Sequence, residues 1–158
     1  MVDKIAKKDQ ILSSLYQGCY TLDEFPKQLK TNCLYIVSDQ PKNIPISHFR
    51  AVATLNNTVS FFCSFGKKPE HSSIISSLQS LGKKIVYNTI PVQHSNSATC
   101  SLHCLFVNYL ISRQFTLEEI LQRFYSFSDP YINDERVSHF ISVVFRETNL
   151  PFYDSDFN

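Results

Sequence analysis

The spacing of apolar residues predicts helices and strands that follow one another along the first third of the chain. Apolar side chains recur at helical spacing over residues 3–17, which predicts an amphipathic helix with Asp3 as its N-cap and Gly18 at its end. The short run 33–37 is almost wholly apolar and rich in β-formers, and it lies between prolines. It predicts a buried strand, and the alternating pattern over 48–55 predicts a second one.

A hairpin, a helix and a further strand are predicted to follow. Asn56-Asn57 supplies turn residues between the second strand and the segment 58–62, so these two strands should pair as a hairpin. Apolar residues at helical spacing predict a helix over 70–81 that stops at Gly82. The segment 84–90 reads as another strand.

The second half of the chain is predicted to be helical. Thr99 is a natural N-cap for a helix that is apolar on nearly every side over 102–111, so this helix should be central and buried. A capping box opens the helix 116–124, and Asn133 caps a last helix that runs to about Arg146. Its inward residues should be Val137, Phe140, Ile141 and Val144. The fold class is therefore α+β, with a small mixed or antiparallel sheet packed against a buried central helix.

Composition favours one folded domain over residues 1–158. Apolar residues make up 43% of the 158 residues and charged residues 18%, which is too apolar for a disordered chain. A formal charge of +1 gives no basic footprint for nucleic acid and no reason to expect a membrane-surface partner. Five cysteines and an N-terminus without an apolar signal segment argue against a disulfide framework. The longest nearly uncharged stretch, 100–112, is too short to span a membrane.

Cys100 is the first candidate for chemistry, because it opens the apolar helix. Backbone N–H groups and the positive end of the helix dipole stabilise a thiolate in a first turn. The structural alternative is that Cys100 is a small core residue, as Cys104 one turn later is expected to be.

A thiol nucleophile needs an imidazole base and donors for the developing oxyanion. His48 opens a predicted strand directly after a loop, a setting that the other four histidines lack, although it would also suit a surface histidine. Gln93 precedes Cys100 by seven residues and is a candidate oxyanion donor, although a loop glutamine is more often solvated. A metal site built from Cys100, His103, Cys104 and Cys63 is disfavoured, because the helix spacing suits tetrahedral zinc poorly. No cofactor or metal is therefore expected.

Three strings of residues carry a resemblance to a known family. They are SHF at 47–49, FFCSFG at 61–66 and VQHSNSATCSLHC at 92–104. Together they resemble the adenovirus-type cysteine proteases, which include adenain and the proteases of polinton or Maverick elements and are distantly related to the SUMO- and ubiquitin-like proteases. The resemblance covers about residues 15–143 and leaves 147–158 as a C-terminal tail. Supporting matches are residues 35–37, residues 86–88, and Asn133-Asp134 with Val137.

The resemblance implies a role for each candidate residue. His48 would be the general base, Gln93 the oxyanion donor and Cys100 the nucleophile, with Cys63 at the position of the family's acid. The chain departs from the family at this acid position, because a thiol is mostly neutral at pH 7 and accepts hydrogen bonds poorly. It also has Ser101 where the family has the glycine after the nucleophile, and Phe49 where the family has Trp after the histidine.

The resemblance implies an intracellular or virion-located thiol endopeptidase whose substrates are viral or transposon structural precursors during virion maturation. Two alternatives stay open. One is a catalytically degenerate homologue that acts as a binding or virion-structural protein, and the other is an isopeptidase of the ubiquitin or SUMO type.

Overall fold

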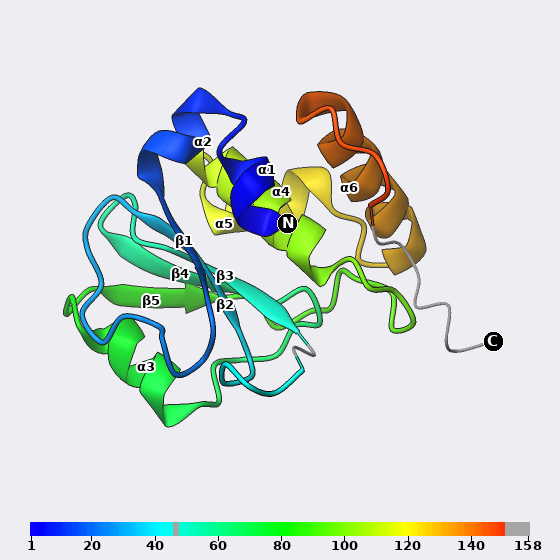
Figure 1. Ribbon diagram of the computed structural model, residues 1–158. Helices are drawn as coiled ribbons and strands as arrows, with labels where there is room; N and C mark the ends of the chain where they lie inside the picture. Colours follow the sequence, from blue (N-terminus) through cyan, green and yellow to red (C-terminus); the bar gives the residue numbers. More distant parts are fainter. Residues whose placement is uncertain (46–47, 151–158) are drawn as a thin grey trace.

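The computed structural model describes residues 1–45 and 48–150, and it has the expected α+β architecture (Figure 1). A five-stranded mixed sheet carries helices on both faces. In chain order the elements are α1 Val2–Ala6, α2 Gln10–Leu15, β1 Tyr16–Tyr20, β2 Leu34–Ser38, β3 Phe49–Ala53, β4 Thr58–Phe62, α3 Ser72–Gln79, β5 Lys84–Tyr87, α4 Cys100–Ser112, α5 Leu117–Phe124 and α6 Pro130–Val144.

The strands lie in the order β1-β2-β3-β4-β5. The two inner pairs, β2 with β3 and β3 with β4, are antiparallel, whereas the outer pairs are parallel. Asn56 and Asn57 both have positive φ, at 56° and 59°, which is the backbone of the predicted hairpin turn between β3 and β4. The predicted hairpin is therefore confirmed. A parallel strand requires a crossover, and α3 provides it between β4 and β5.

This topology brings residues from distant parts of the chain to one edge of the sheet. Strands β2, β4 and β5 run in the same direction, and β3 runs against them. The residues after β2, β4 and β5 therefore lie at the same end as the residue before β3. These residues are Asp39, Cys63, Asn88 and His48.

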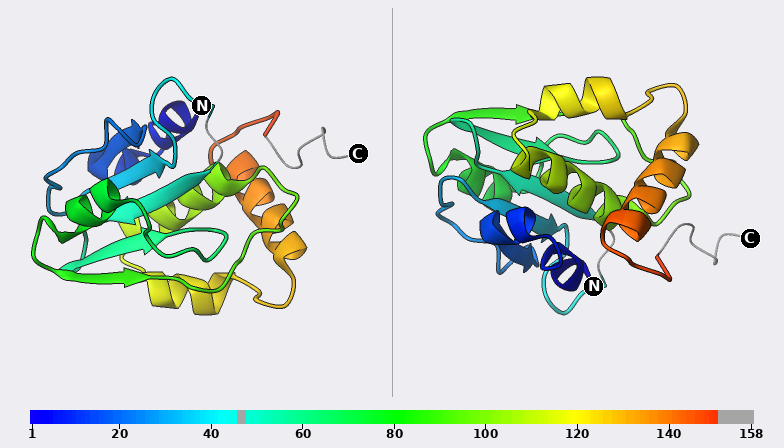
Figure 2. Two further views of the ribbon diagram at one scale, coloured as in Figure 1. Left: turned by 90° about the horizontal axis from the view of Figure 1, so that it is seen from below. Right: turned by 90° about the horizontal axis from the view of Figure 1, so that it is seen from above.

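The apolar helix α4 packs against β3 and forms the centre of the molecule (Figure 2). Helices α1, α2, α5 and α6 surround it, while α3 covers the opposite face of the sheet. Alternate residues of β2 enter the two cores: Leu34 and Ile36 face α4, and Tyr35 and Val37 face α3. The expectation that this helix is central and buried is confirmed. None of the helices in the described ranges is long and apolar enough to cross a membrane.

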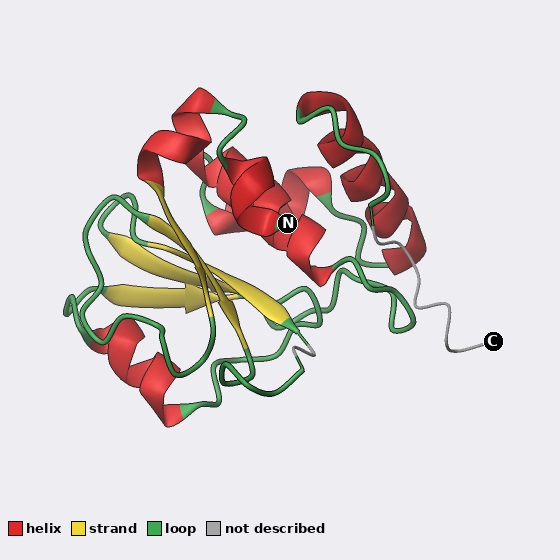
Figure 3. Ribbon diagram, viewed as in Figure 1, coloured by secondary structure: helices red, strands yellow, loops and turns green. Residues whose placement is uncertain are grey.

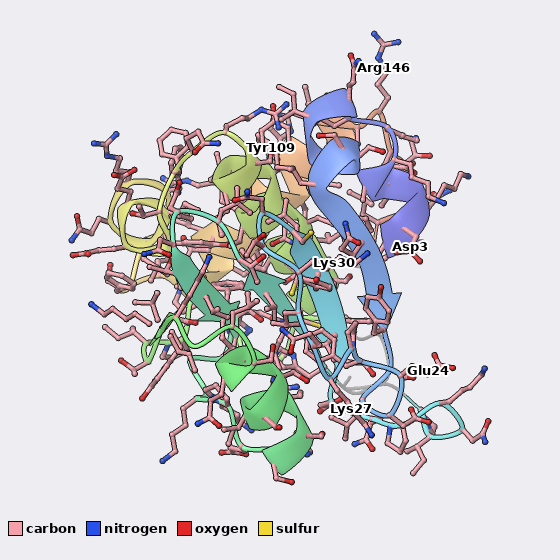
Figure 4. The ribbon with its side chains drawn as sticks, turned by 90° about the vertical axis from the view of Figure 1, so that its left-hand side faces the viewer. Asp3, Glu24, Lys27, Lys30, Tyr109 and Arg146 are labelled. Carbon is pink, nitrogen blue, oxygen red and sulfur yellow. The ribbon has the colours of Figure 1, made fainter. Side chains whose placement is uncertain are left out.

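The N-terminal region differs from its prediction. The single helix expected over residues 3–17 is two short helices and a strand. Asp9 interrupts it, because its carboxylate accepts a hydrogen bond from the Leu12 N–H at 2.8 Å and caps α2. Asp3 is not a cap; its carboxylate accepts hydrogen bonds from the Tyr16 hydroxyl and the Cys19 N–H and so joins α1 to β1 (Figure 4).

The predicted caps of two later helices also need correction. Thr99 precedes α4, but its side chain makes no capping hydrogen bond to this helix. Helix α6 is capped by Asp129, which accepts from the Ile132 N–H, and Asn133 lies inside the helix. Val137 and Ile141 are buried as predicted, whereas Val144 is 38% exposed. The capping box of Thr116 and Glu119 at the start of α5 is confirmed.

Candidate active site

The imidazole of His48 lies at the end of the sheet where the strand topology collects polar residues. It is buried, and its Nε2 lies 3.2 Å from the Sγ of Cys63. The ring of Phe65 stacks on it, with the ring centroids 4.7 Å apart and an angle of 29° between the planes. Cys63 and Phe65 follow β4 and His48 precedes β3, so the β3–β4 pairing positions all three. Ser47 of the SHF string lies outside the described residues.

The backbone of His48 is held by Asp39, a residue that sequence analysis missed. The Asp39 carboxylate accepts a hydrogen bond from the His48 N–H at 3.0 Å, and the Asp39 N–H donates to the His48 carbonyl at 3.0 Å. The same carboxylate forms an ion pair with Arg50, at 3.6 Å. These contacts extend the β2–β3 pairing by one residue and fix the position of the main chain that carries the imidazole.

The His48 imidazole is neutral over the physiological pH range. Burial, followed by the positive charge of Arg50, lowers the pKa of His48 to about 3, and the Asp39 carboxylate offsets this only in part. Its Nδ1 is buried and has no hydrogen-bond partner among the described residues. Because Nε2 faces Cys63, Nδ1 is the ring atom that remains for a proton transfer.

The thiol of Cys100 lies beside the backbone that carries His48. Cys100 is half-buried and is the first residue of α4, and the Phe49 N–H donates to its sulfur. Burial raises the pKa of the Cys100 thiol, and the N–H groups of Phe49, Ser101 and Cys100 lower it by less. The expected thiolate stabilisation at this first turn is therefore present, but desolvation outweighs it, and the resting side chain is a thiol.

The main chain of Cys63 is clamped by the buried side chain of Asn88. The Cys63 N–H donates to Asn88 Oδ1 at 3.0 Å, and Asn88 Nδ2 donates to the Cys63 carbonyl at 2.7 Å. Asn88 directly follows β5, so β4 and β5 together fix the thiol that faces His48.

Gln93 is not a solvated loop residue but a buried one. Its Oε1 accepts a hydrogen bond from the Ser64 hydroxyl at 2.5 Å, and its Nε2 donates to the Ser97 carbonyl at 2.8 Å. Its backbone N–H also donates to the Ser64 carbonyl. These contacts fix the orientation of the amide between Ser64 and Ser97 and leave one of the two Nε2 hydrogens for another acceptor.

Ser101, which follows the candidate nucleophile, causes no backbone strain. It is buried within α4 and is absent from the residues with positive φ, so the chain there does not need glycine. Its N–H faces the Cys100 sulfur.

A buried polar cluster behind Cys100 was not anticipated. Asp134 of α6 accepts hydrogen bonds from His103 Nε2 at 2.8 Å and from the Thr99 hydroxyl at 3.0 Å. His103 Nδ1 meets the Tyr125 hydroxyl at 2.9 Å. The sequence did hold a signal, because Asp134 shares the inward helical stripe with Val137 and Ile141, where a charged residue needs a partner.

The positions considered for a metal do not form a metal site. Both ring nitrogens of His103 already have hydrogen-bond partners, because Nε2 meets Asp134 and Nδ1 meets Tyr125. Over residues 1–45 and 48–150, no group of three His, Cys, Asp or Glu side chains is arranged to hold a metal ion.

Comparison with known proteins identifies no family for this chain. No protein-family model matches the sequence, and no curated protein matches it significantly. The geometry described above therefore carries the functional argument.

Proposed function

We propose that the protein is a cysteine endopeptidase of the adenovirus type that processes viral or transposon structural precursors. Cys100 is the nucleophile, His48 the general base and Gln93 an oxyanion donor, with Cys63 at the acid position. The observation that carries the proposal is the convergence of three distant segments at one end of the sheet. The His48 imidazole meets Cys63, and the next N–H, of Phe49, meets the Cys100 sulfur.

The proposed reaction begins from a neutral thiol and a neutral imidazole. His48 Nδ1 takes the Cys100 proton as the sulfur attacks the scissile carbonyl, and a tetrahedral oxyanion forms. The free Nε2 hydrogen of Gln93 and the Cys100 N–H stabilise this oxyanion. The amine then leaves with the proton from His48, and water hydrolyses the thioester with His48 again as base.

The Cys63 contact decides how well His48 serves as the base. When Nε2–H donates to the Cys63 sulfur, Nδ1 is unprotonated and can accept a proton. When the Cys63 S–H donates to Nε2 instead, Nδ1 carries the hydrogen and cannot act. An ionised carboxylate only accepts and so enforces the productive tautomer, whereas a thiol permits both.

The same contact favours a second function, that of a catalytically degenerate homologue with a binding or virion-structural role. A buried imidazole with a pKa of about 3 stabilises a charged intermediate poorly, and Cys63 supplies no fixed negative charge beside it. This candidate predicts a folded protein whose Cys100 reacts no faster when His48 is present.

Reaction with p-nitrophenyl acetate tests the proposal without knowledge of the cleavage sequence. We expect acylation that disappears in Cys100→Ala and falls at least tenfold in His48→Ala, because the thiol then lacks its base. In Gln93→Ala, acylation should fall by about 10²-fold, the usual effect of removing an oxyanion donor. His139→Ala, which alters an exposed histidine of α6, is the matched control. Equal rates in all these variants would support the degenerate homologue.

A further inference from the structure

Two neighbouring residues of α6, Asn133 and Asp134, reach the loop that joins β5 to α4. Both side chains are buried, with 1% and 0% of their surface exposed. The loop passes from the end of the sheet to the first turn of α4 (Figure 3), and it carries Gln93. A buried amide and a buried carboxylate at adjacent positions must each find hydrogen-bond partners there.

Asp134 joins the middle of this loop to its last residue. One carboxylate oxygen accepts a hydrogen bond from the His94 N–H at 3.1 Å. The other accepts from the Thr99 hydroxyl at 3.0 Å and from His103 Nε2 at 2.8 Å. One side chain therefore holds the residue after Gln93 and the residue before Cys100.

Asn133 holds the other side of Gln93. Its Nδ2 donates to the Val92 carbonyl at 2.9 Å and to the Ser126 carbonyl at 2.6 Å, and its Oδ1 accepts from the Ser126 N–H at 2.8 Å. Val92 and His94 flank Gln93 in the chain, so α6 makes hydrogen bonds to the main chain on both sides of that residue.

His103 and Tyr125 complete the support for Asp134. Burial lowers the pKa of His103 and raises that of Tyr125, so the imidazole is neutral and the phenol keeps its proton. The Tyr125 hydroxyl then donates to His103 Nδ1, and Nε2–H donates to the carboxylate. All three groups that meet Asp134 are donors, as an ionised carboxylate requires.

We infer that Asn133 and Asp134 are positioning residues of the oxyanion hole, which set Gln93 in register with the first turn of α4. The inference rests on the function proposed above. In it, Asn133 and Asp134 of α6 influence catalysis although neither side chain touches the reacting atoms. Asp134 acts through His94 and Thr99, and Asn133 acts through Val92.

Two reagents separate positioning of the oxyanion hole from general integrity of the site. In acylation by p-nitrophenyl acetate, the Cys100 sulfur bonds to the acetyl carbonyl carbon and a tetrahedral oxyanion forms. The bond between that carbon and the p-nitrophenolate oxygen then breaks, and p-nitrophenolate leaves. In alkylation by iodoacetamide, the same sulfur displaces iodide and no oxyanion forms. A defect confined to the oxyanion hole therefore slows the first reaction and spares the second.

Asp134→Asn places an NH₂ group against the donors that the carboxylate accepts from. It should therefore weaken the hydrogen bonds between α6 and the loop. We expect its acylation rate to fall at least tenfold, while alkylation of Cys100 stays within about twofold. Glu135→Gln, the same chemical change at the exposed neighbouring residue of α6, should leave both rates unchanged.

In a Gln93→Ala background, Asp134→Asn should change acylation by less than about threefold, because its effect passes through Gln93. Thr99→Val, which removes one donor and keeps the carboxylate, should give a smaller loss of the same kind and serves if Asp134→Asn does not fold.

Equal losses of acylation with and without Gln93, or a folded Asp134→Asn protein with unchanged acylation, would overturn the inference. NMR of the Gln93 side-chain amide decides the matter if Cys100 proves unreactive and the proposed function itself fails. These amide signals, assigned by their loss in Gln93→Ala, should shift in Asp134→Asn or Thr99→Val and not in Glu135→Gln. Unchanged signals in the first two variants would contradict the positioning role.

Discussion

At the scale of single residues, the proposed chemistry depends most on the contact between His48 and Cys63. The imidazole is stacked on Phe65 and held through its backbone by Asp39, so its orientation does not depend on a carboxylate at position 63. What a thiol at this position fails to supply is charge. The pKa of His48 lies at about 3 and that of Cys100 is raised, so the resting pair is neutral.

This neutral pair predicts a distinctive pH dependence of Cys100 alkylation by iodoacetamide. Because only the thiolate reacts, the rate should rise about tenfold per pH unit from pH 6 to pH 9, without a plateau at lower pH. A thiolate–imidazolium pair would instead react at a constant rate over several pH units. A plateau in the wild-type profile would contradict the neutral pair. Alkylation quenched at successive times, followed by mass spectrometry of the Cys100 peptide, measures the rate at each pH.

Cys63→Asp should convert the neutral pair into an ionised one. A carboxylate beside Nε2 raises the pKa of His48, and the resulting imidazolium favours the Cys100 thiolate. We expect at least a tenfold increase in alkylation at pH 6, together with faster acylation by p-nitrophenyl acetate. Cys63→Asn has nearly the same shape without the charge and should give neither gain. A sharp fall in both rates for Cys63→Asp would show that Cys63 does not occupy the acid position.

At the scale of elements, the β4–α3 loop, which carries Cys63, approaches the β5–α4 loop, which carries Gln93, very closely. Gly66 has a φ of +71°, and a Cβ added there would lie 2.7 Å from the carbonyl carbon of Ile90 and from the nitrogen of Pro91. Ile90 and Pro91 lie in the β5–α4 loop, shortly before Gln93. Glycine at position 66 therefore lets the two loops touch.

Gly66→Ala is expected to destabilise the protein much more than Gly82→Ala. Gly82 also has a positive φ, at +63°, but a Cβ there would meet nothing within 4 Å. Gly82→Ala therefore carries only the backbone cost of about 1 kcal/mol, whereas Gly66→Ala adds a clash with main-chain atoms and should cost about 2 kcal/mol more. Urea denaturation of both variants measures the difference, and equal losses would contradict the close approach.

Local signals made several elements predictable from the sequence. The Asn56-Asn57 turn and the capping box at Thr116 act within a few residues, and both appear where expected. The segment 3–17 was mispredicted because its apolar spacing suits a helix, whereas pairing with β2 makes Tyr16–Tyr20 a strand. Sequence alone carries no information on such a distant partner.

The candidate site was predictable to the same limited degree. His48, Cys63, Gln93 and Cys100 were selected from the sequence, and the strand topology places His48 against Cys63. Asp39, Asn88 and Asp134 were missed as site residues because their roles arise from contacts between distant segments. The apolar stripe of α6 marked Asp134 as unusual, but only the fold shows that its partners are His94, Thr99 and His103.

At the scale of the whole molecule, two buried histidines tie stability to pH. His48 and His103 lie on different elements, and burial lowers the pKa of each. Both are neutral in the folded protein at a pH where the unfolded chain binds protons. The free energy of unfolding therefore falls as the pH drops below about 6.5, the ordinary histidine pKa.

His48 should account for a defined part of this loss. Between its unfolded pKa of about 6.5 and its folded pKa of about 3, the unfolded state binds one more proton, so stability declines by up to about 1.4 kcal/mol per pH unit. In His48→Gln, which cannot titrate, the decline between pH 6.5 and pH 4 should be shallower by roughly this amount. His71→Gln, at an exposed site before α3, should keep the wild-type slope. Urea denaturation across this pH range measures the slopes, and identical slopes for wild type and His48→Gln would show that the imidazole is not buried in its neutral form.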